Sequence, residues 1–427
     1  MPTPLKLFKK FSVFSLDESE LSWYTRTMEN QMKVGHISAS SISSFKACPT
    51  RFRLGYSEGI RLAIEPQPLR FGTNWHKGLE ILGFPNGTQY ITKDNAPGGV
   101  IVTDENRLAL AVEAATDVYT TIPDYADPTE WAVEREIIAN GLAAYHWLYP
   151  DASSEYEVVA TELQFDLPLV NPETGHATPT FRRVGKIDKI IRSKRSGQLF
   201  IEEHKSTSRP IDSGSTYWDR LRKDTQSKFY IVAARDLRHE IDPEADRVNV
   251  VSGLLHDAFH KPTIKPSKLT QAESAEFVKT GDYCGQKFQP QWLEPNNCEV
   301  DGIQAEIEPG KKEGTFALRE TPGMFGARLL QDMTQKPEFY FARREIAFTD
   351  AELLDFQYQV WALQRTMAEM ERTGHWYDNE NQCEAVGSFK CPYMPICYSN
   401  VACCDGVTVP SGFKRIRHEE TETGVAE

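Results

Sequence analysis

The sequence predicts a single α/β domain in which helices flank a mixed β-sheet, and three observations indicate this fold class. Helical periodicity dominates up to about residue 150, strand-like alternation follows, and helical periodicity then returns. The chain has 427 residues, of which 40% are hydrophobic and 11% aromatic, so a sizeable core is available. No stretch approaches the roughly 20 apolar residues of a membrane span. Because the N-terminus lacks the continuous apolar region of a signal peptide, we expect a cytoplasmic protein.

Three segments make up the expected domain organisation. Residues 1–35 form a lead-in with a helical piece at 20–33, residues 36–405 form the main domain, and residues 406–427 form a disordered acidic tail. Within the main domain, the stretch from about 260 to 320 is rich in Pro, Lys and Glu and has little periodicity. We therefore expect an insertion or a set of loops there.

The helices and strands of the main domain follow from their periodicity and end signals. The first helix is expected within 36–56, where Ser40 or Ser41 can cap it. A long helix is expected at 215–237, and a helix at 350–374 starts with an Asp cap and ends with a Gly stop. The other expected elements are helices at 71–84, 107–122 and 134–149, strands at 155–170, 247–259 and 340–349, and a hairpin at 182–205 with "SKRSG" as its turn.

The net charge of −13 argues weakly against a nucleic-acid-binding protein, because phosphate binding is electrostatic. It does not exclude one, since a local basic groove can bind nucleic acid on an acidic protein. The charge balance alone is therefore not decisive.

Charged residues occur where the predicted hairpin should bury apolar ones. Side chains alternate along a strand, so Glu203 and Lys205 point to one face while Glu202 and His204 point to the other. A five-residue turn brings Asp188 beside them. Two converging carboxylates repel each other unless a cation lies between them, and hard oxygen ligands suit Mg²⁺ or Mn²⁺. The alternative is a surface hairpin with ordinary Glu–Lys pairing, but the neighbours in "KIDKII" and "LFIEEHK" are apolar, which favours a metal site.

An Asp followed by a strand ending in Glu-x-Lys resembles the PD-(D/E)XK nuclease superfamily. "GKIDKI" with "IEEHKSTS" resembles its RecB-like and CRISPR-adaptation-type iron–sulfur exonuclease branch. Two more stretches match motifs of that branch in order: "GTNWHKGLE" gives His76 and Glu80, and "QSKFY" gives Gln226 and Tyr230. The resemblance extends from residue 36 to about 400.

The resemblance implies a restriction-endonuclease-like mixed sheet and specific roles for the motif residues. His76, Asp188, Glu203 and the backbone carbonyl of His204 would bind Mg²⁺ or Mn²⁺, and Lys205 would help to activate the attacking water. Gln226 and Tyr230 would position DNA and the lysine. The additional acids Glu80 and Glu162 would lie just outside the metal ligands.

Eight cysteines are present, and five of them lie between 383 and 404. In a cytosolic protein such clustering favours a metal or iron–sulfur site over disulfides. The resemblance implies a 4Fe–4S cluster bound by Cys48, Cys383, Cys391 and Cys397, which would join the two ends of the domain. The alternative is a structural Zn²⁺ bound by Cys383, Cys391, Cys397 and Cys403.

Basic residues near the motifs are candidates for phosphate contacts. They are Arg51, Arg53, Arg220, Arg222, Arg343 and Arg344. The aromatic residues Trp75, Tyr217 and Trp218 could stack on bases, although core packing is the more expected role for each.

The resemblance implies a metal-dependent DNA exonuclease that hydrolyses phosphodiester bonds. Its expected substrate is DNA with a free end, with single-stranded DNA as one candidate. The expected setting is recombination, repair or replication, in a phage-encoded protein acting in the host cytoplasm, with a helicase or recombinase as a candidate partner. The alternatives are a non-catalytic DNA-end-binding protein of the same fold and a restriction-type endonuclease.

Overall fold

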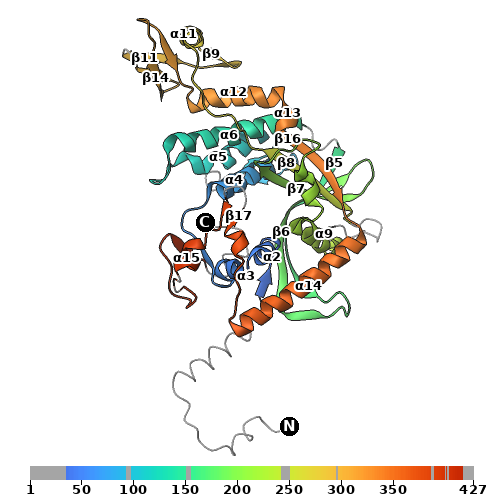
Figure 1. Cartoon of the computed structure of the whole chain (residues 1–427). Helices are drawn as coiled ribbons and strands as arrows, with labels where there is room; N and C mark the ends of the chain where they lie inside the picture. The colour runs from blue at the N-terminus through green and yellow to red at the C-terminus, as the bar shows by residue number, and fades with distance from the viewer. Residues whose placement is uncertain are drawn as a thin grey trace, which may run out of the picture.

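A computed structural model describes residues 35–92, 98–150, 155–241, 251–294, 297–385, 389–399, 401 and 403–416. Helices pack on both faces of a central sheet (Figure 1), as the sequence predicts. The helical piece expected at 20–33 lies outside the described residues, as does the first part of the strand expected at 247–259.

The central sheet is mixed, with six strands in the order β1-β6-β7-β8-β16 and with β5 paired to β6. The pairs β5–β6, β6–β7 and β8–β16 are antiparallel, whereas β1–β6 and β7–β8 are parallel. Its strands are β1 (Gly35–Ile37), β5 (Tyr156–Val170), β6 (Ala177–Ser193), β7 (Leu199–Thr207), β8 (Gly253–His260) and β16 (Phe341–Ala347). The predicted hairpin at 182–205 is therefore confirmed.

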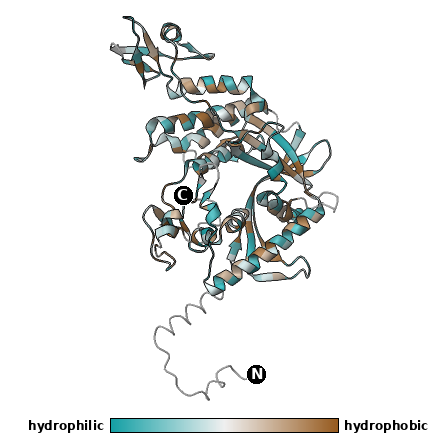
Figure 2. Cartoon of the chain, in the orientation of Figure 1, coloured by the Kyte–Doolittle hydropathy of each residue, from teal (hydrophilic) through white to brown (hydrophobic). Residues whose placement is uncertain are grey.

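Two hydrophobic cores lie on the two faces of the sheet. One contains Phe45, Ile187, Phe229 and Phe356, and it joins the sheet to α2 (Ala39–Ala47), α9 (Thr225–Asp236) and α14 (Asp350–Thr373). The other contains Trp75 and Phe259, and it joins the sheet to α4 (Gln67–Leu82), α6 (Pro128–Leu148) and α12 (Pro322–Gln335). Figure 2 shows hydrophobic and hydrophilic residues mixed along these elements, as expected for elements that bury one face.

Shorter elements connect the layers. They are α3 (Pro49–Phe52), the π-helical turn η2 (Arg53–Ser57), β2 (Ile60–Leu62), β3 (Gln89–Tyr90), β4 (Val100–Ile101), α5 (Arg107–Thr116), the 3₁₀ turn η3 (Asp117–Thr120), α8 (Thr216–Leu221), α10 (Arg238–Ile241) and α13 (Pro337–Tyr340).

Three helix boundaries differ from the prediction because side-chain caps start the helices elsewhere. Ser38 caps α2, and Ser41 completes the capping box as the third helical residue, so neither Ser40 nor Ser41 is the cap. The single helix predicted at 215–237 is wrong: Asp224 accepts a hydrogen bond from the Ser227 amide and starts α9 separately from α8. Thr349 rather than Asp350 caps α14, which ends at Gly374 with a left-handed backbone (φ 70°).

The stretch from 260 to 320 is more regular than the expected set of loops. It forms a small unit at the top of Figure 1 with its own core, which includes Phe277, Phe288 and Cys298. Short hairpins supply this core. The sequence did not predict them because each strand spans only two to five residues, which is too few for a periodic pattern to be recognised. The elements are α11 (Gln271–Thr280), β9 (Asp282–Tyr283), β10 (Gln286–Lys287), β11 (Pro290–Glu294), β12 (Asn297–Val300), β13 (Ile303–Ala305), β14 (Ile307–Pro309) and β15 (Phe316–Leu318).

The C-terminal segment returns to the N-terminal helices. It contains η4 (Glu380–Gln382), β17 (Glu384–Ala385), β18 (Phe389–Lys390), α15 (Met394–Ser399) and β19 (Phe413–Arg415). Strand β19 pairs with β2, so the disordered tail predicted from residue 406 is wrong for 406–416, and residues 417–427 lie outside the described part. Within the described ranges, no helix is long and apolar enough to span a membrane.

Candidate active site

The β6–β7 hairpin brings Asp188 and Glu203 together. Lys189 pairs with Glu202 in the ladder, so the next positions along the hairpin are Asp188 and Glu203. The Glu203 side chain is buried (2% exposed), and Asp188 is mostly buried (17%). The convergence of two carboxylates at this end of the hairpin, predicted from the spacing, is therefore present in the structure.

Glu203 is a buried carboxylate with few partners in the described part of the chain. Among the described residues, only the Lys205 ammonium contacts it, and no other group donates a hydrogen bond to its oxygens. Burial, together with the charge of Asp188, raises the pKa of Glu203 to about 7, although Lys205 opposes the shift. The ionised form of Glu203 is therefore unfavourable in the fold, and a bound cation would stabilise it.

Lys205 lies between helix α9 and the carboxylates of Asp188 on β6 and Glu203 on β7. Its ammonium contacts Glu203 and donates a hydrogen bond to Gln226 Oε1 over 2.9 Å. Burial lowers the pKa of Lys205, but the adjacent Glu203 carboxylate outweighs this effect, and the net pKa lies above its ordinary value. Lys205 is therefore a cation at neutral pH, positioned by Gln226.

Tyr230 lies one turn after Gln226 on α9, as the Q-x-x-x-Y spacing predicts. It packs edge-to-face against Phe165 with ring centroids 6.2 Å apart, and burial raises its pKa well above the ordinary value. Gly185 makes room for this packing, because a Cβ there would lie 2.7 Å from the Phe165 ring and 3.3 Å from Tyr230. The glycine in "GKIDKI" thus permits the close approach of α9 to β6.

Helix α4 positions His76 opposite Asp188. Its neighbour Trp75 is 1% exposed and stacks on Phe259 with ring centroids 4.2 Å apart, which fixes the rotation of the helix. The His76 Nδ1 atom then lies 3.3 Å from Asp188 Oδ2. Burial favours a higher pKa for Asp188, but the contacts with His76 and the charge of Lys205 overcome it and hold the pKa well below its usual range.

A small cavity joins His76 and Asp188 to two further acids, Glu80 and Glu162. Its free volume is about 10 Å³, which is room for about one water-sized sphere. Burial, and then the charge of Glu162, raise the pKa of Glu80. Glu162 itself has a left-handed backbone (φ 51°) within β5 and pairs with Lys186. Both acids therefore lie beside the predicted ligands, as expected.

A buried ion-pair network behind β7 was not predicted. Lys189 Nζ lies 2.8 Å from Glu202 Oε2, and Arg343 lies 3.5 Å from Glu202 and 3.1 Å from Asp257. The His204 ring lies 3.3 Å from Asp257, and the Tyr145 hydroxyl donates to the same carboxylate. The sequence carried one signal of it, since Glu202 and His204 were expected on the face of β7 opposite Glu203.

Glu202, His204 and Asp257 have ligand atoms within 4.8 Å of one another, close enough to share a metal ion. The two carboxylates are already balanced by the ammonium of Lys189 and the guanidinium of Arg343. Because a divalent cation would add two positive charges to a balanced cluster, the arrangement fits an internal ion-pair network better than a second metal centre.

The candidate DNA-contact residues divide into accessible and inaccessible groups. Arg220 and Arg222 are exposed on and just after α8, Arg51 and Arg53 are half-buried, and Arg344 donates to the Ser213 carbonyl. Arg343 is enclosed in the network behind β7 and stacks 3.8 Å from the Tyr149 ring centre, so the predicted phosphate contact is wrong for this residue. Trp75, Tyr217 and Trp218 are all buried and pack in the core.

The C-terminal segment that carries Cys383, Cys391 and Cys397 returns to the N-terminal helices that flank Cys48. The β17–β18 hairpin joins Cys383 and Cys391, whose backbone atoms share a 2.9 Å hydrogen bond. The segment docks beside Cys48, because Asn379 donates to the Ala47 carbonyl over 2.8 Å. Burial raises the pKa of Cys397 to about 11, and Asp378, Cys391, Cys48 and Cys383 add to the shift.

A mixed sheet flanked by helices, with Asp188, Glu203 and Lys205 gathered at one end of a hairpin, defines a class of metal-dependent nucleases. Comparison with protein families identifies that class: a model described as the PD-(D/E)XK nuclease superfamily matches residues 36–398. The chain therefore belongs to this superfamily. The comparison with curated proteins found no match.

Proposed function

We propose that this protein is a Mg²⁺- or Mn²⁺-dependent DNA exonuclease of the RecB-like iron–sulfur branch. The observation that carries the proposal is the buried Glu203 carboxylate, which faces Asp188 and, among the described residues, has only Lys205 as a partner. Asp188 and Glu203 share this one ammonium, so burying both carboxylates is costly unless a further cation binds beside them. Its position next to Asp188, which lines the cavity, is that of a metal ligand rather than of a core residue.

The donor atoms at this site are of the kind that a hard divalent cation binds, and the cation would draw Asp188, Glu203 and His76 together, since their ligand atoms do not all lie within 4.8 Å of one another. Asp188, Glu203, His76 and the His204 carbonyl would hold it, and Glu80 and Glu162 supply further oxygens around the cavity. When bound, the cation would lower the pKa of a coordinated water and stabilise negative charge on the phosphate.

The protein's own groups would divide the remaining tasks. Since the pKa of Lys205 is raised, its ammonium would orient the water and stabilise phosphate charge rather than remove a proton. Gln226 holds the ammonium through its 2.9 Å hydrogen bond. Tyr230 lies beside the same site, where it would line the DNA-binding surface.

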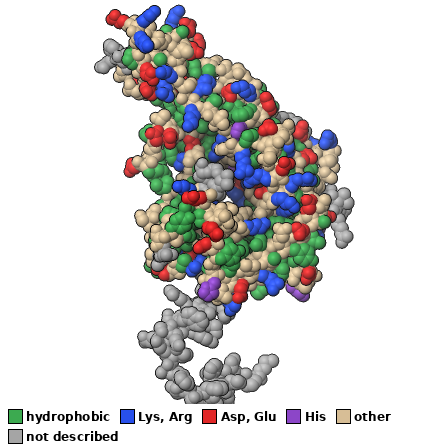
Figure 3. All heavy atoms as spheres, viewed as in Figure 1, with side chains coloured by type: hydrophobic (Ala, Val, Ile, Leu, Met, Phe, Trp, Pro, Cys, Tyr) green, Lys and Arg blue, Asp and Glu red, His purple; other side chains and the backbone are tan. Residues whose placement is uncertain are grey.

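The proposed substrate is DNA with a free end, and recombination, repair or replication is the proposed setting. Figure 3 shows Lys and Arg side chains gathered to the right of the centre of the visible face, over the region of β6 and β7. The exposed Arg220 and Arg222 add positive charge near Gln226. A local positive surface of this kind supports phosphate binding despite the net charge of −13.

We also propose a 4Fe–4S cluster bound by Cys48, Cys383, Cys391 and Cys397. The charges of the first three act on Cys397, which supports their convergence. The alternative Zn²⁺ site would hold its sulfurs about 3.8 Å apart, given a tetrahedral ion with bonds of about 2.3 Å. No three cysteines in the described ranges have sulfurs within 4.8 Å of one another. A four-iron cluster binds each sulfur to a different iron, so it does not require the sulfurs to lie as close together as a zinc ion does.

An assay with end-labelled DNA tests the proposed activity. Linear single- and double-stranded DNA labelled at either end, and closed circular DNA, are incubated with Mg²⁺, Mn²⁺ or EDTA. We expect metal-dependent shortening of linear DNA, intact circles, and no cleavage by Asp188→Ala. Equal cutting of circles would show an endonuclease instead. DNA binding without cleavage under any metal would show a non-catalytic end-binding protein.

A further inference from the structure

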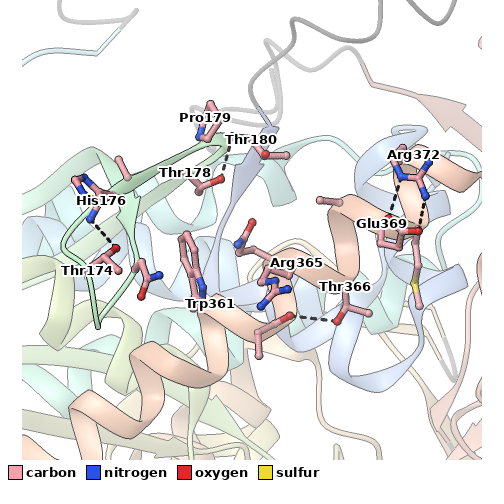
Figure 4. Close-up of a pocket in the computed structure, with 16 residues that line it drawn as sticks. Thr174, His176, Thr178, Pro179, Thr180, Trp361, Arg365, Thr366, Glu369 and Arg372 are labelled. Carbon is pink, nitrogen blue, oxygen red and sulfur yellow. Dashed lines mark hydrogen bonds and ion pairs between the residues drawn. The ribbon is translucent and has the colours of Figure 1, made fainter.

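A buried histidine nitrogen on strand β8 has no hydrogen-bond partner in the described part of the chain. It is the Nδ1 atom of His256, a residue that is only 1% exposed. By contrast, the groove of about 890 Å³ between helix α14 and the outer end of the β5–β6 hairpin (Figure 4) has no such atom among its described lining side chains. Because an unpaired buried polar atom is costly, its surroundings indicate which group it would bind.

His256 lies beside Glu203 on one face of the sheet. The parallel pairing of β7 with β8 places the two residues opposite each other, and paired residues of neighbouring strands direct their side chains to the same face. Neighbouring strands are about 4.8 Å apart, so the two side chains start within reach of each other. Apart from Lys205, no described residue donates a hydrogen bond to the Glu203 carboxylate. Two adjacent buried groups therefore lack a partner, and one can donate what the other accepts.

Tyr217 on α8 holds the other nitrogen of the His256 ring. Its hydroxyl lies 2.7 Å from Nε2, and Trp218 packs edge-to-face against the ring with centroids 5.9 Å apart. Burial, and then the charge of Lys205, lower the pKa of His256 to about 4, so the ring is neutral at physiological pH and carries one proton. A hydroxyl that donates to Nε2 leaves that proton on Nδ1, where the Glu203 carboxylate attracts it. The opposite tautomer would place a buried lone pair beside a carboxylate and is therefore less stable.

Other carboxylates that act on the His256 ring by their charge are committed elsewhere. Asp224 accepts a hydrogen bond from the backbone amide that it caps at the start of α9. Asp257, the next residue on β8, points to the opposite face and pairs with Arg343 in the network behind β7. Glu203 is therefore the acceptor that Nδ1 can bind.

We propose that His256 is a positioning residue of the nuclease site, which donates a hydrogen bond from Nδ1 to the Glu203 carboxylate. This role rests on the proposed function, because it concerns Glu203 as a metal ligand. The two groups are adjacent but not hydrogen-bonded in this structure, so a small rotation of either side chain, or one bridging water molecule, completes the contact. A carboxylate has two oxygens, so one can accept this bond while the other binds the cation. Hydrogen bonds of this kind fix the orientation of a metal ligand.

Two substitutions separate the donor from the packing of the ring. His256→Asn keeps an amide donor near the position of Nδ1, whereas His256→Gln places its amide near the position of Nε2 and loses that donor. The dissociation constant for Mn²⁺ is measured by calorimetry on the full chain without DNA, and circular dichroism reports whether each variant keeps the fold. We expect this constant to rise roughly tenfold in His256→Gln and by less than about threefold in His256→Asn. An equal constant in the two variants would show a packing role and overturn the proposal.

Tyr217→Phe tests the hydrogen bond that orients the ring. It removes only a hydroxyl, so it also tests the proposal if His256→Gln does not fold. We expect it to raise the dissociation constant about threefold in the otherwise unaltered protein, and to have no effect in His256→Gln, where the donor is already lost. An unchanged constant in Tyr217→Phe would overturn the proposal.

His260 provides a matched control. It is also buried on β8, but its Nδ1 donates to the Phe339 carbonyl over 3.2 Å. His260→Gln should therefore leave the affinity for Mn²⁺ unchanged. If the unaltered protein neither binds Mn²⁺ nor cleaves DNA, the proposed function fails, whereas equal binding by the unaltered protein and His256→Gln would overturn only the role of His256.

Discussion

Replacing Glu203 by glutamine should stabilise the metal-free protein. The substitution keeps the size of the side chain and removes a buried charge that, within the described part of the chain, is paired only with Lys205. In the unfolded chain this carboxyl titrates near its ordinary pKa of 4.5, whereas burial and Asp188 raise the pKa to about 7 in the fold. The ionised form is therefore less stable in the folded protein than in the unfolded chain.

The size of the effect follows from the two pKa values. A difference of about 2.5 pKa units corresponds to about 3 kcal/mol at pH 8. The raised pKa already includes the opposing effect of Lys205, so the loss of that contact is part of the difference. We expect Glu203→Gln to raise the free energy of unfolding by about 1–3 kcal/mol at pH 8.

The sign of the pH dependence follows from proton binding. Between about pH 4.5 and 7 the folded protein binds a proton at Glu203 that the unfolded chain has released, so the stability of the unaltered protein falls as pH rises. Above pH 7 the difference is constant. Most of the advantage of Glu203→Gln should therefore be absent at pH 5.

The neighbouring Glu202 provides a matched control. It is equally buried, but Lys189, His204 and Arg343 lower its pKa although burial itself raises it. Glu202→Gln leaves the Lys189 ammonium without its 2.8 Å partner. We expect this variant to be destabilised by about 3 kcal/mol, because removing one member of a buried ion pair leaves the charge of the other buried and uncompensated.

Guanidinium chloride unfolding in EDTA, followed by circular dichroism at pH 8 and pH 5 under anaerobic conditions, measures these differences. Added Mn²⁺ should then stabilise the unaltered protein but not Glu203→Gln, since only the former binds the ion tightly. A Glu203→Gln variant less stable than the unaltered protein at pH 8 would refute the reasoning, as would a gain that is the same size at pH 5.

Further predictions concern the site and the cysteines. Lys205→Ala and Asp188→Ala should each lower cleavage of end-labelled DNA by at least about a hundredfold while leaving the circular dichroism spectrum unchanged; full activity in either would contradict the assigned roles. The dissociation constant for Mn²⁺, measured by calorimetry, should rise by up to about tenfold per unit as pH falls below 7, because Glu203 must lose its proton to bind; a constant affinity would argue against Glu203 as a ligand. Anaerobically purified protein should be brown with broad absorption near about 400 nm, whereas colourless protein with one zinc per chain would show the alternative site. Cys48→Ser should lose the colour and lower the melting temperature, and an unchanged melting curve would count against a clasp between the two ends of the domain.

The central site was predictable because its residues are close in sequence or lie at fixed helical spacing. Asp188, Glu203 and Lys205 belong to one hairpin, so alternation and turn length were enough to bring them together. Gln226 and Tyr230 are four residues apart on α9. The partners of Glu202 and His204 were not predictable, because Asp257 and Arg343 come from β8 and β16, whose positions in the sheet depend on pairing between distant segments.

Local patterns also misled at specific places. The stretch 215–237 has continuous helical periodicity, yet the Asp224 cap divides it into two helices. Arg343 resembles a surface cation in sequence, but pairing of β16 with β8 places it against Asp257. In both cases a side-chain contact outweighs the periodicity on which the prediction rested.

The sequence by itself determined the fold class, the hairpin and the grouping of two acids with a lysine, because period and spacing are local properties. Only the tertiary structure decided that Glu203 is buried with Lys205 as its one charged partner among the described residues, while Glu202, one residue away, is enclosed by two cations. The two carboxylates have the same intrinsic chemistry and opposite pKa shifts. The difference arises because electrostatic free energy depends on the solvent and charges that folding brings around each group, and those come from strands far apart in the chain.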